Sequence, residues 1–146
     1  MNKNLIKSED ILEIYVDGAC RKNPGPASYA FIFVKNDEII HHKSEFIGNA
    51  TNNIAEYTAI IRALEEAEKF TRWGIKVYSD SQLAIKQINK KWRIKAQHLS
   101  DLCDQVYRQR EKFEKVEFYQ IGRENPYIQK CDALCNDCLD RKGIKK

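Results

Sequence analysis

The sequence predicts an α/β protein with one five-stranded mixed sheet, in which three antiparallel strands come first and parallel strands follow. Three observations support this fold class. Five short stretches are rich in β-branched and aromatic residues, and four longer stretches carry apolar residues at helical spacing. The order of these stretches is βββαβααβα. A hairpin that precedes βαβ-type units gives a sheet of mixed direction.

The predicted strands are short apolar or alternating stretches. Residues 28–36 and 38–46 are joined at Asn36-Asp37, which indicates a β-hairpin. The expected strands are 11–18, 28–36, 38–46, 75–80 and 116–122.

The predicted helices carry apolar stripes. In the longest, Ile60, Ala63 and Ala67 recur at helical spacing. Ser81 precedes another helix and has the side chain of an N-cap residue. The expected helices are 52–70, 81–90, 95–113 and 127–143.

Length and composition suit one domain. The 146 residues, 42% of them hydrophobic, are enough for a single core. No apolar run approaches the ~20 residues of a membrane span, and the first ten residues lack the features of a secretory signal. We therefore expect a cytoplasmic protein with one domain at 11–142 and tails at 1–10 and 143–146. The net charge of +4 permits a nucleic-acid partner without requiring one.

Three of the five cysteines have a spacing with two interpretations. Cys131, Cys135 and Cys138 form C-x3-C-x2-C, which is similar to the iron–sulfur motif of radical S-adenosylmethionine enzymes. The same spacing puts all three on one helical face, where they would pack as small apolar side chains. The chain is short for the barrel of those enzymes, which favours packing.

Two aspartates end predicted strands. Asp17 and Asp80 each follow a tyrosine, Tyr15 and Tyr78, by two positions, so each aspartate projects from the same face as its tyrosine. Both lie at the carboxyl ends of strands that we expect to be central. That edge of an open α/β sheet is where ligands bind.

Two further acids lie on helical apolar faces. Glu56 comes four residues before Ile60, and Asp132 comes three residues before Cys135. Each of the four acids also has a local explanation. These are turn formation by Asp17-Gly18, a capping box over Asn53-x-x-Glu56, helix capping by Asp80-Ser81, and an ion pair of Asp132 with Lys130 or Arg141.

Taken together, the four acids favour a metal site. A carboxylate beside a core is costly unless it is paired with a cation. The sequence places no matching basic residue beside the four. Such a cluster is typical of hard divalent cations such as Mg²⁺ or Mn²⁺.

Four blocks of the chain resemble type 1 ribonuclease H. They are "YVDGACRKNPGPASYA", "TNNIAEYTAIIRAL", "VYSDSQLAI" and "CDALCN", and they span about Ile11 to Leu139. The resemblance implies a ribonuclease H-like fold and a monomeric endonuclease that hydrolyses the RNA strand of RNA–DNA hybrids. It implies two Mg²⁺ ions, with Mn²⁺ as a substitute, and products with 5′-phosphate and 3′-hydroxyl ends. The implied catalytic and metal-binding residues are Asp17, Glu56, Asp80 and Asp132.

The resemblance also implies contacts to the minor groove of the hybrid. The matching positions are Asn23, Asn52 and Gln82, with Asn53 and Cys20 at neighbouring positions. Amide side chains both donate to and accept from the 2′-hydroxyls that distinguish RNA from DNA. Helix capping by Asn52-Asn53 and a turn at Asn23 are compatible with this role.

The chain departs from the family pattern in two places. The loop before Asp132 contains no histidine, and Arg123 and Glu124 are the candidates to replace it. The basic helix that many members insert after the segment at 81–90 is missing. What remains is a basic-aromatic patch around Trp92, which is either a DNA-backbone contact or a solvated helix junction. Its charged members are Lys90, Lys91, Arg93 and Lys95.

Two other functions fit the same residues less well. A catalytically inactive hybrid-binding module would not need all four acids. Another nuclease or a transposase-type domain of the same fold would not need the Asn52-Asn53 and Asp80-Ser81-Gln82 blocks. No separate hybrid-binding domain fits in this length, and we expect no obligate protein partner.

Overall fold

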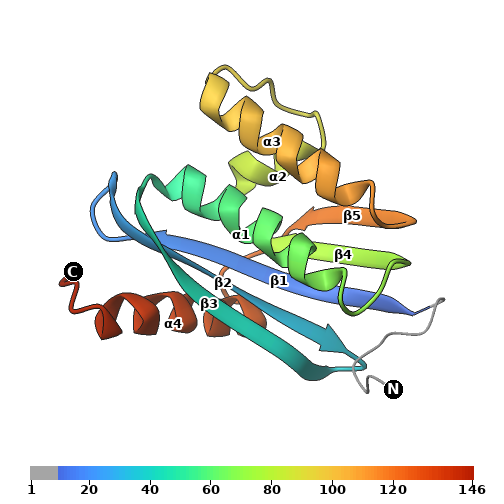
Figure 1. The fold of residues 1–146 in the computed structure, drawn as a ribbon, viewed down its shortest axis with the longest axis horizontal. Coiled ribbons are helices and arrows are strands. Elements are labelled where there is room, and N and C mark those ends of the chain that lie inside the picture. The colour runs from blue at the N-terminus through green and yellow to red at the C-terminus, as the bar shows by residue number, and fades with distance from the viewer. Residues whose placement is uncertain (1–9) are drawn as a thin grey trace.

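The computed structural model describes residues 10–146, whose elements follow the expected βββαβααβα order (Figure 1). The strands are β1 (Ile11–Cys20), β2 (Gly25–Lys35), β3 (Glu38–Ala50), β4 (Gly74–Ser79) and β5 (Lys115–Gln120). The helices are α1 (Asn52–Ala67), α2 (Gln82–Ile88), α3 (Gln97–Arg110) and α4 (Pro126–Arg141). Nearly all of the predicted N-terminal tail lies outside the described residues.

The strands form one sheet in the order β3-β2-β1-β4-β5. β2 pairs antiparallel with β1 and β3, while β4 pairs parallel with β1 and β5. The predicted mixed sheet is therefore confirmed. Because β1 and β4 are parallel neighbours, their carboxyl ends meet at one edge of the sheet.

The antiparallel hairpin is longer than its apolar pattern predicts. β2 begins at Gly25 rather than at residue 28, and β3 continues to Ala50 rather than ending at residue 46. The added residues pair with each other, as Gly25 does with Ala50. Ladder pairing stabilises residues whose own strand propensity is weak, so these ends were not visible in the sequence.

Helices cover both faces of the sheet. The helices α1, α2 and α3 lie on one face and α4 lies on the other (Figure 1). β2 is buried on both sides, because Phe31 and Phe33 pack toward α1 while Ala30 and Ile32 pack toward α4. Its continuous apolar run is what a strand between two layers requires.

The cysteines of α4 pack against the sheet, as the helical interpretation of their spacing predicts. The Cys131 and Cys135 thiols are buried and donate to the main-chain carbonyls of Tyr15 and Asp17, at 3.3 and 3.5 Å. Cys138 is buried as well. Among residues 10–146, these sulfurs form no group close enough to hold a metal, which favours packing over an iron–sulfur cluster.

Two residues of the expected C-terminal tail form hydrogen bonds to the end of α4. The Gly143 N–H donates to Asp140 O at 2.9 Å, and the Ile144 N–H donates to Leu139 O at 3.1 Å. This hydrogen-bond pattern closes the helix end and holds both residues against it. Within residues 10–146, no helix has both the length and the apolar character needed to cross a lipid bilayer.

Candidate active site

Asp17 and Asp80 lie side by side at the carboxyl edge of the sheet. Tyr15 of β1 pairs with Tyr78 of β4, so the residues two positions later are neighbours across the two strands. β4 ends at Ser79, and Asp80 stands at the entry to α2. Asp17 is buried at 5% exposure, whereas Asp80 is partly exposed. The predicted position of both acids is confirmed.

Glu56 reaches the same point from the first turns of α1. The N-cap of α1 is Thr51, whose hydroxyl accepts from the Ile54 N–H at 3.2 Å. The proposed capping box over Asn53-x-x-Glu56 is therefore wrong. Because Thr51 satisfies the helix end, the Glu56 carboxylate is free to turn toward β1, where its Oε1 accepts from the Gly18 N–H at 2.5 Å.

Gly18 permits the close approach of α1 to β1. A Cβ atom at this position would lie 2.4 Å from the main-chain carbon of Ala55 and 2.7 Å from the nitrogen of Glu56. No side chain fits there without displacing the helix backbone. Gly18 lies within β1 and pairs with Tyr29, so the proposed turn at Asp17-Gly18 is wrong. The glycine instead sets the distance between Asp17 and Glu56.

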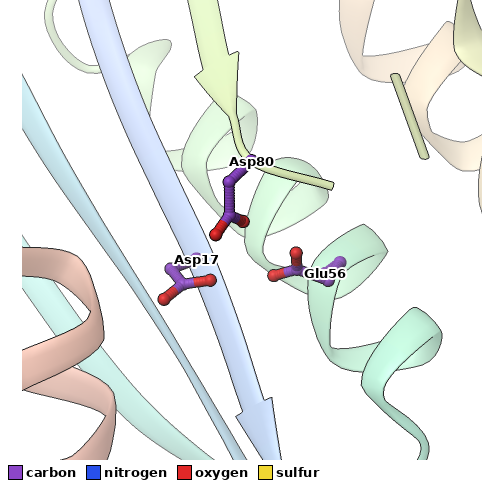
Figure 2. Close-up of side chains that lie close together, drawn as sticks. All are labelled: Asp17, Glu56 and Asp80. Atoms are coloured by element: carbon purple, nitrogen blue, oxygen red, sulfur yellow. The ribbon is translucent and has the colours of Figure 1, made fainter. Parts of the chain in front are cut away.

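The three carboxylates form one cluster. Oxygen atoms of Asp17, Glu56 and Asp80 all lie within 4.8 Å of one another. Figure 2 shows the three side chains pointing toward a common point from β1, α1 and the segment after β4. Three converging carboxylates form an all-oxygen donor set, which suits Mg²⁺ or Mn²⁺ and offers no nitrogen or sulfur to softer metals.

Two acids of the cluster, Asp17 and Glu56, hold their protons more tightly than free carboxylic acids do. Burial, and then the nearby charge of Asp80, raises the pKa of Asp17 from 3.8 to about 7. Burial, followed by the charges of Asp17 and Asp80, likewise raises the pKa of Glu56 well above its usual value. Crowded carboxylates without a counter-charge favour the neutral form. A bound divalent cation would reverse this preference.

Arg123 supplies a counter-charge that the sequence did not reveal. Its Nε lies 3.2 Å from Asp80 Oδ2, so the expectation that no basic group stands beside the acids is wrong. The loop from β5 to α4 is short, because Ile121 still pairs with Ser79 and Asn125 already caps α4. The intervening residues cross the end of β4. Arg123 is 91% exposed, so the pair adds at most about 1 kcal/mol to stability.

Asp132 lies in the same cleft but outside the three-carboxylate cluster. It is exposed on α4 and lines the cleft together with Asp17, Glu56 and Asp80. The proposed ion pair with Arg141 is not formed, because Arg141 pairs with Asp137 at 3.0 Å.

Most of the predicted substrate-binding residues line this cleft, which has a volume of about 520 Å³. Cys20, Asn52, Asn53, Gln82 and Arg123 line it, whereas Asn23 and Glu124 do not. The carboxylate of Glu124 instead lies next to Gly122.

Asn23 does not line the cleft but contacts Asn52, which does. Its side-chain oxygen accepts from the main-chain N–H of Asn52 at 3.0 Å. The Cys20 thiol donates to the Asn52 side-chain oxygen at 3.0 Å. These contacts tie the β1–β2 turn to the start of α1, and they were not predicted.

The basic-aromatic patch lies apart from the cleft, at the junction of α2 and α3. Trp92 is 42% exposed, and the amine of Lys86 lies 5.3 Å from its ring. Lys90, Lys91 and Arg93 are exposed beside it.

Comparisons with known proteins agree with this fold and site. A protein-family model described as reverse transcriptase-like matches residues 15–138. The crystal structure of RNase H1 from the halophilic archaeon Halobacterium salinarum NRC-1 aligns with a TM-score of 0.85 at 34% sequence identity, covering 90% of this chain and 98% of that one. The structure of LC11-RNase H1 in complex with an RNA/DNA hybrid aligns with a TM-score of 0.83 at 30% identity, again covering 90% and 98%.

A longer relative also matches. A bifunctional protein of Mycobacterium tuberculosis is 33% identical over 130 residues, which are 87% of this chain but 35% of that protein. The chain therefore spans about a third of the length of this relative.

The sheet topology and the acidic cluster at its carboxyl edge define a ribonuclease H-like domain. Together with these matches, they show that the chain belongs to the ribonuclease H family. The resemblance found in the sequence is confirmed.

Proposed function

We propose that the chain is an endonuclease that hydrolyses the RNA strand of RNA–DNA hybrids with two Mg²⁺ ions, for which Mn²⁺ can substitute. The products would carry 5′-phosphate and 3′-hydroxyl ends. The observation that carries the proposal is the cluster of Asp17, Glu56 and Asp80 within 4.8 Å at the base of the cleft. A relative of this fold has been solved with an RNA/DNA hybrid, which supports the substrate.

Each acid has a proposed part in holding the ions. Asp17, Glu56 and Asp80 offer oxygens at the base of the cleft, and Asp132 offers one from the exposed α4 side. The chemistry that divalent ions supply in such a site is activation of the attacking water and stabilisation of the leaving 3′ oxygen. Gly18 holds Glu56 in place through its N–H.

The amide residues have the proposed task of recognising RNA. Asn52, Asn53 and Gln82 line the cleft beside the acids. Their side chains can donate to and accept from the 2′-hydroxyls of a wide minor groove. Asn23 and Cys20 orient Asn52 from behind. Arg123 faces the cleft and suits contact with a phosphate near the reacting one.

The expected cytoplasmic location, the monomeric state and the boundaries at 11–142 stay predictions.

One assay tests the proposal. The protein is incubated with Mg²⁺ and an end-labelled RNA–DNA hybrid, duplex RNA or duplex DNA, and the product ends are determined. We expect cleavage of the hybrid alone, and almost none from Asp80→Asn, because a neutral amide holds Mg²⁺ poorly. Asp104→Asn, an exposed change on α3, is the matched control. Comparable cleavage of either other duplex would indicate another nuclease, and binding without cleavage would indicate an inactive hybrid-binding module.

A further inference from the structure

Arg21 is a buried cation that the proposed chemistry does not use. It directly follows β1, is 7% exposed, and its guanidinium contacts residues at and just after the C-terminal end of α4. Its Nη2 pairs with Asp140 at 2.8 Å and donates to the Asn136 main-chain and side-chain oxygens at 3.2 Å each. Its Nη1 donates to the main-chain oxygen of Ile144. Arg21 therefore holds the segment after α4 against the β1–β2 turn.

The held segment lies at the end of the molecule where the substrate-binding residues stand. Figure 1 shows the C-terminal end of the chain on the same side as the β1–β2 turn and the start of α1. That turn carries Asn23, which bonds to Asn52 at the cleft wall. Two residues of extended chain span at most about 7 Å, so Lys145 and Lys146 stay close to the point that Arg21 fixes.

The surface beside the turn carries unpaired positive charge. Four lysines, Lys22, Lys142, Lys145 and Lys146, are exposed there. Two acids in the last turns of α4 are paired with arginines, because Asp140 pairs with Arg21 and Asp137 pairs with Arg141. Among residues 10–146, none of the four lysines forms an ion pair with a carboxylate. Lys142 is partly engaged, since its amine lies 5.4 Å from the ring of Phe46.

We propose that the segment 142–146, held by Arg21 beside the β1–β2 turn, contacts the phosphate backbone of the RNA–DNA hybrid on the side of the cleft away from the Trp92 patch. The proposal rests on the function proposed above. In an A-like duplex the wide, shallow minor groove is bordered by phosphates of both strands. A hybrid whose minor groove meets Asn52 therefore brings phosphates next to the turn. Lysines contact such phosphates as point charges.

The test measures hybrid affinity against salt concentration. Lys145→Ala/Lys146→Ala removes two charges without touching the cleft or the core. Each lost phosphate contact should lower the slope of log affinity against log salt by roughly 0.7–0.9, so the double variant should lose roughly 1–2. The matched control is Lys112→Ala/Lys115→Ala, two exposed lysines before and at the start of β5, at the opposite edge of the sheet. Its slope should stay close to that of the wild type.

A second variant tests the role of Arg21. Arg21→Met keeps all four lysines but releases the segment that carries three of them, so its slope should fall as in the double variant. In a chain lacking residues 143–146, Arg21→Met should have no additional effect on the slope. An additional effect of the same size would mean that Arg21 does not act through the segment. Circular dichroism checks that Arg21→Met folds. If it does not fold, Lys145→Ala/Lys146→Ala alone still tests whether these lysines contact the hybrid backbone.

The proposal is overturned if Lys145→Ala/Lys146→Ala binds hybrid with the wild-type slope. In that case hybrid cleavage by the wild type would still support the proposed function. If the wild type neither binds nor cleaves the hybrid, the proposed function itself has failed.

Discussion

The main-chain N–H of Gly18 donates to the Glu56 carboxylate at 2.5 Å, and this bond joins the end of β1 to the first turns of α1. The same N–H lies 3.0 Å from Asp17 Oδ1, so one donor orients two acids of the cluster. The contact requires a glycine, because a Cβ atom would stand 2.4 Å from the backbone of α1. Cluster geometry thus depends on a residue that carries no functional group.

Gly18→Ala should therefore separate the acids. Forcing a methyl group between β1 and α1 costs about 1–3 kcal/mol of stability. Since Glu56 moves with the helix, kcat should fall by roughly 10²-fold, the effect of a displacement of about 1 Å. Melting temperature and steady-state kinetics measure the two effects.

Gly48→Ala is the control for lost stability alone. Gly48 has φ +97° and an open environment, so alanine there strains β3 without touching the cleft. It should melt lower than wild type with kcat nearly unchanged. If Gly18→Ala kept wild-type kcat, the bond to Glu56 would not position the cluster.

The sequence predicted the fold and the places of Asp17 and Asp80 at strand ends because both depend on local patterns. The period-2 strand and period-3.6 helix patterns are visible in one chain, and so are Asp17 and Asp80 at strand ends. Thr51 as the cap of α1, and not Asn53, was not visible, since either side chain can accept from a helix N-terminus. The local pattern could not decide between them.

Arg123 and Arg21 show the limit of local patterns more clearly. Each pairs with an acid from a distant part of the chain, Asp80 in one case and Asp140 in the other. Such pairs depend on how loops cross the sheet edge and on how α4 lies across the sheet. Neither arrangement has a signature in residue spacing.

Arg123→Ala should lower kcat more than it raises KM. The guanidinium stands beside Asp80 at the mouth of the cleft, where it can stabilise charge that develops on a phosphate or assist product release. The loss should be at most roughly 10²–10⁴-fold.

Arg72→Ala is the matched control for Arg123. Arg72 is also exposed and pairs with a carboxylate, Glu68, at 3.3 Å, but it lies after α1 and outside the cleft. It should have wild-type kinetics. A loss confined to KM in Arg123→Ala would assign Arg123 to substrate binding only. Wild-type kinetics there would mean that the role of the missing histidine is filled elsewhere or absent.

The Trp92 patch should contribute to binding through charge. Lys90→Ala/Lys91→Ala removes two exposed cations and should lower the slope of log affinity against log salt by roughly 1–2. The effect should be similar for different hybrid sequences, because phosphates carry no sequence information. A slope equal to that of Lys112→Ala/Lys115→Ala would remove the patch from the substrate path.

Crowding of the carboxylates should make the site destabilising without metal. The folded-state pKa of Asp17 is raised to about 7 from 3.8, so the folded chain binds more protons than the unfolded chain between these values. In chelator, the free energy of unfolding should therefore fall as pH rises from about 4 to about 7. The full shift corresponds to at most about 4 kcal/mol, and sharing of charge with Glu56 reduces it.

Asp17→Asn should therefore melt higher than wild type in chelator at pH 7, although it is inactive. The amide oxygen can still accept from the Gly18 N–H, and the variant loses the buried charge. We expect a gain of about 2–4 °C for each kcal/mol relieved. Asp132→Asn should gain less, because Asp132 is exposed, and Asp104→Asn should not gain.

Added Mg²⁺ should raise the melting temperature of the wild type more than that of Asp17→Asn, because the ion binds the folded carboxylates. Melts of the four proteins across pH, with chelator and with Mg²⁺, measure all of these effects. If Asp17→Asn melts lower than wild type without metal, the Arg123 guanidinium already balances the cluster and the carboxylates do not repel one another as inferred.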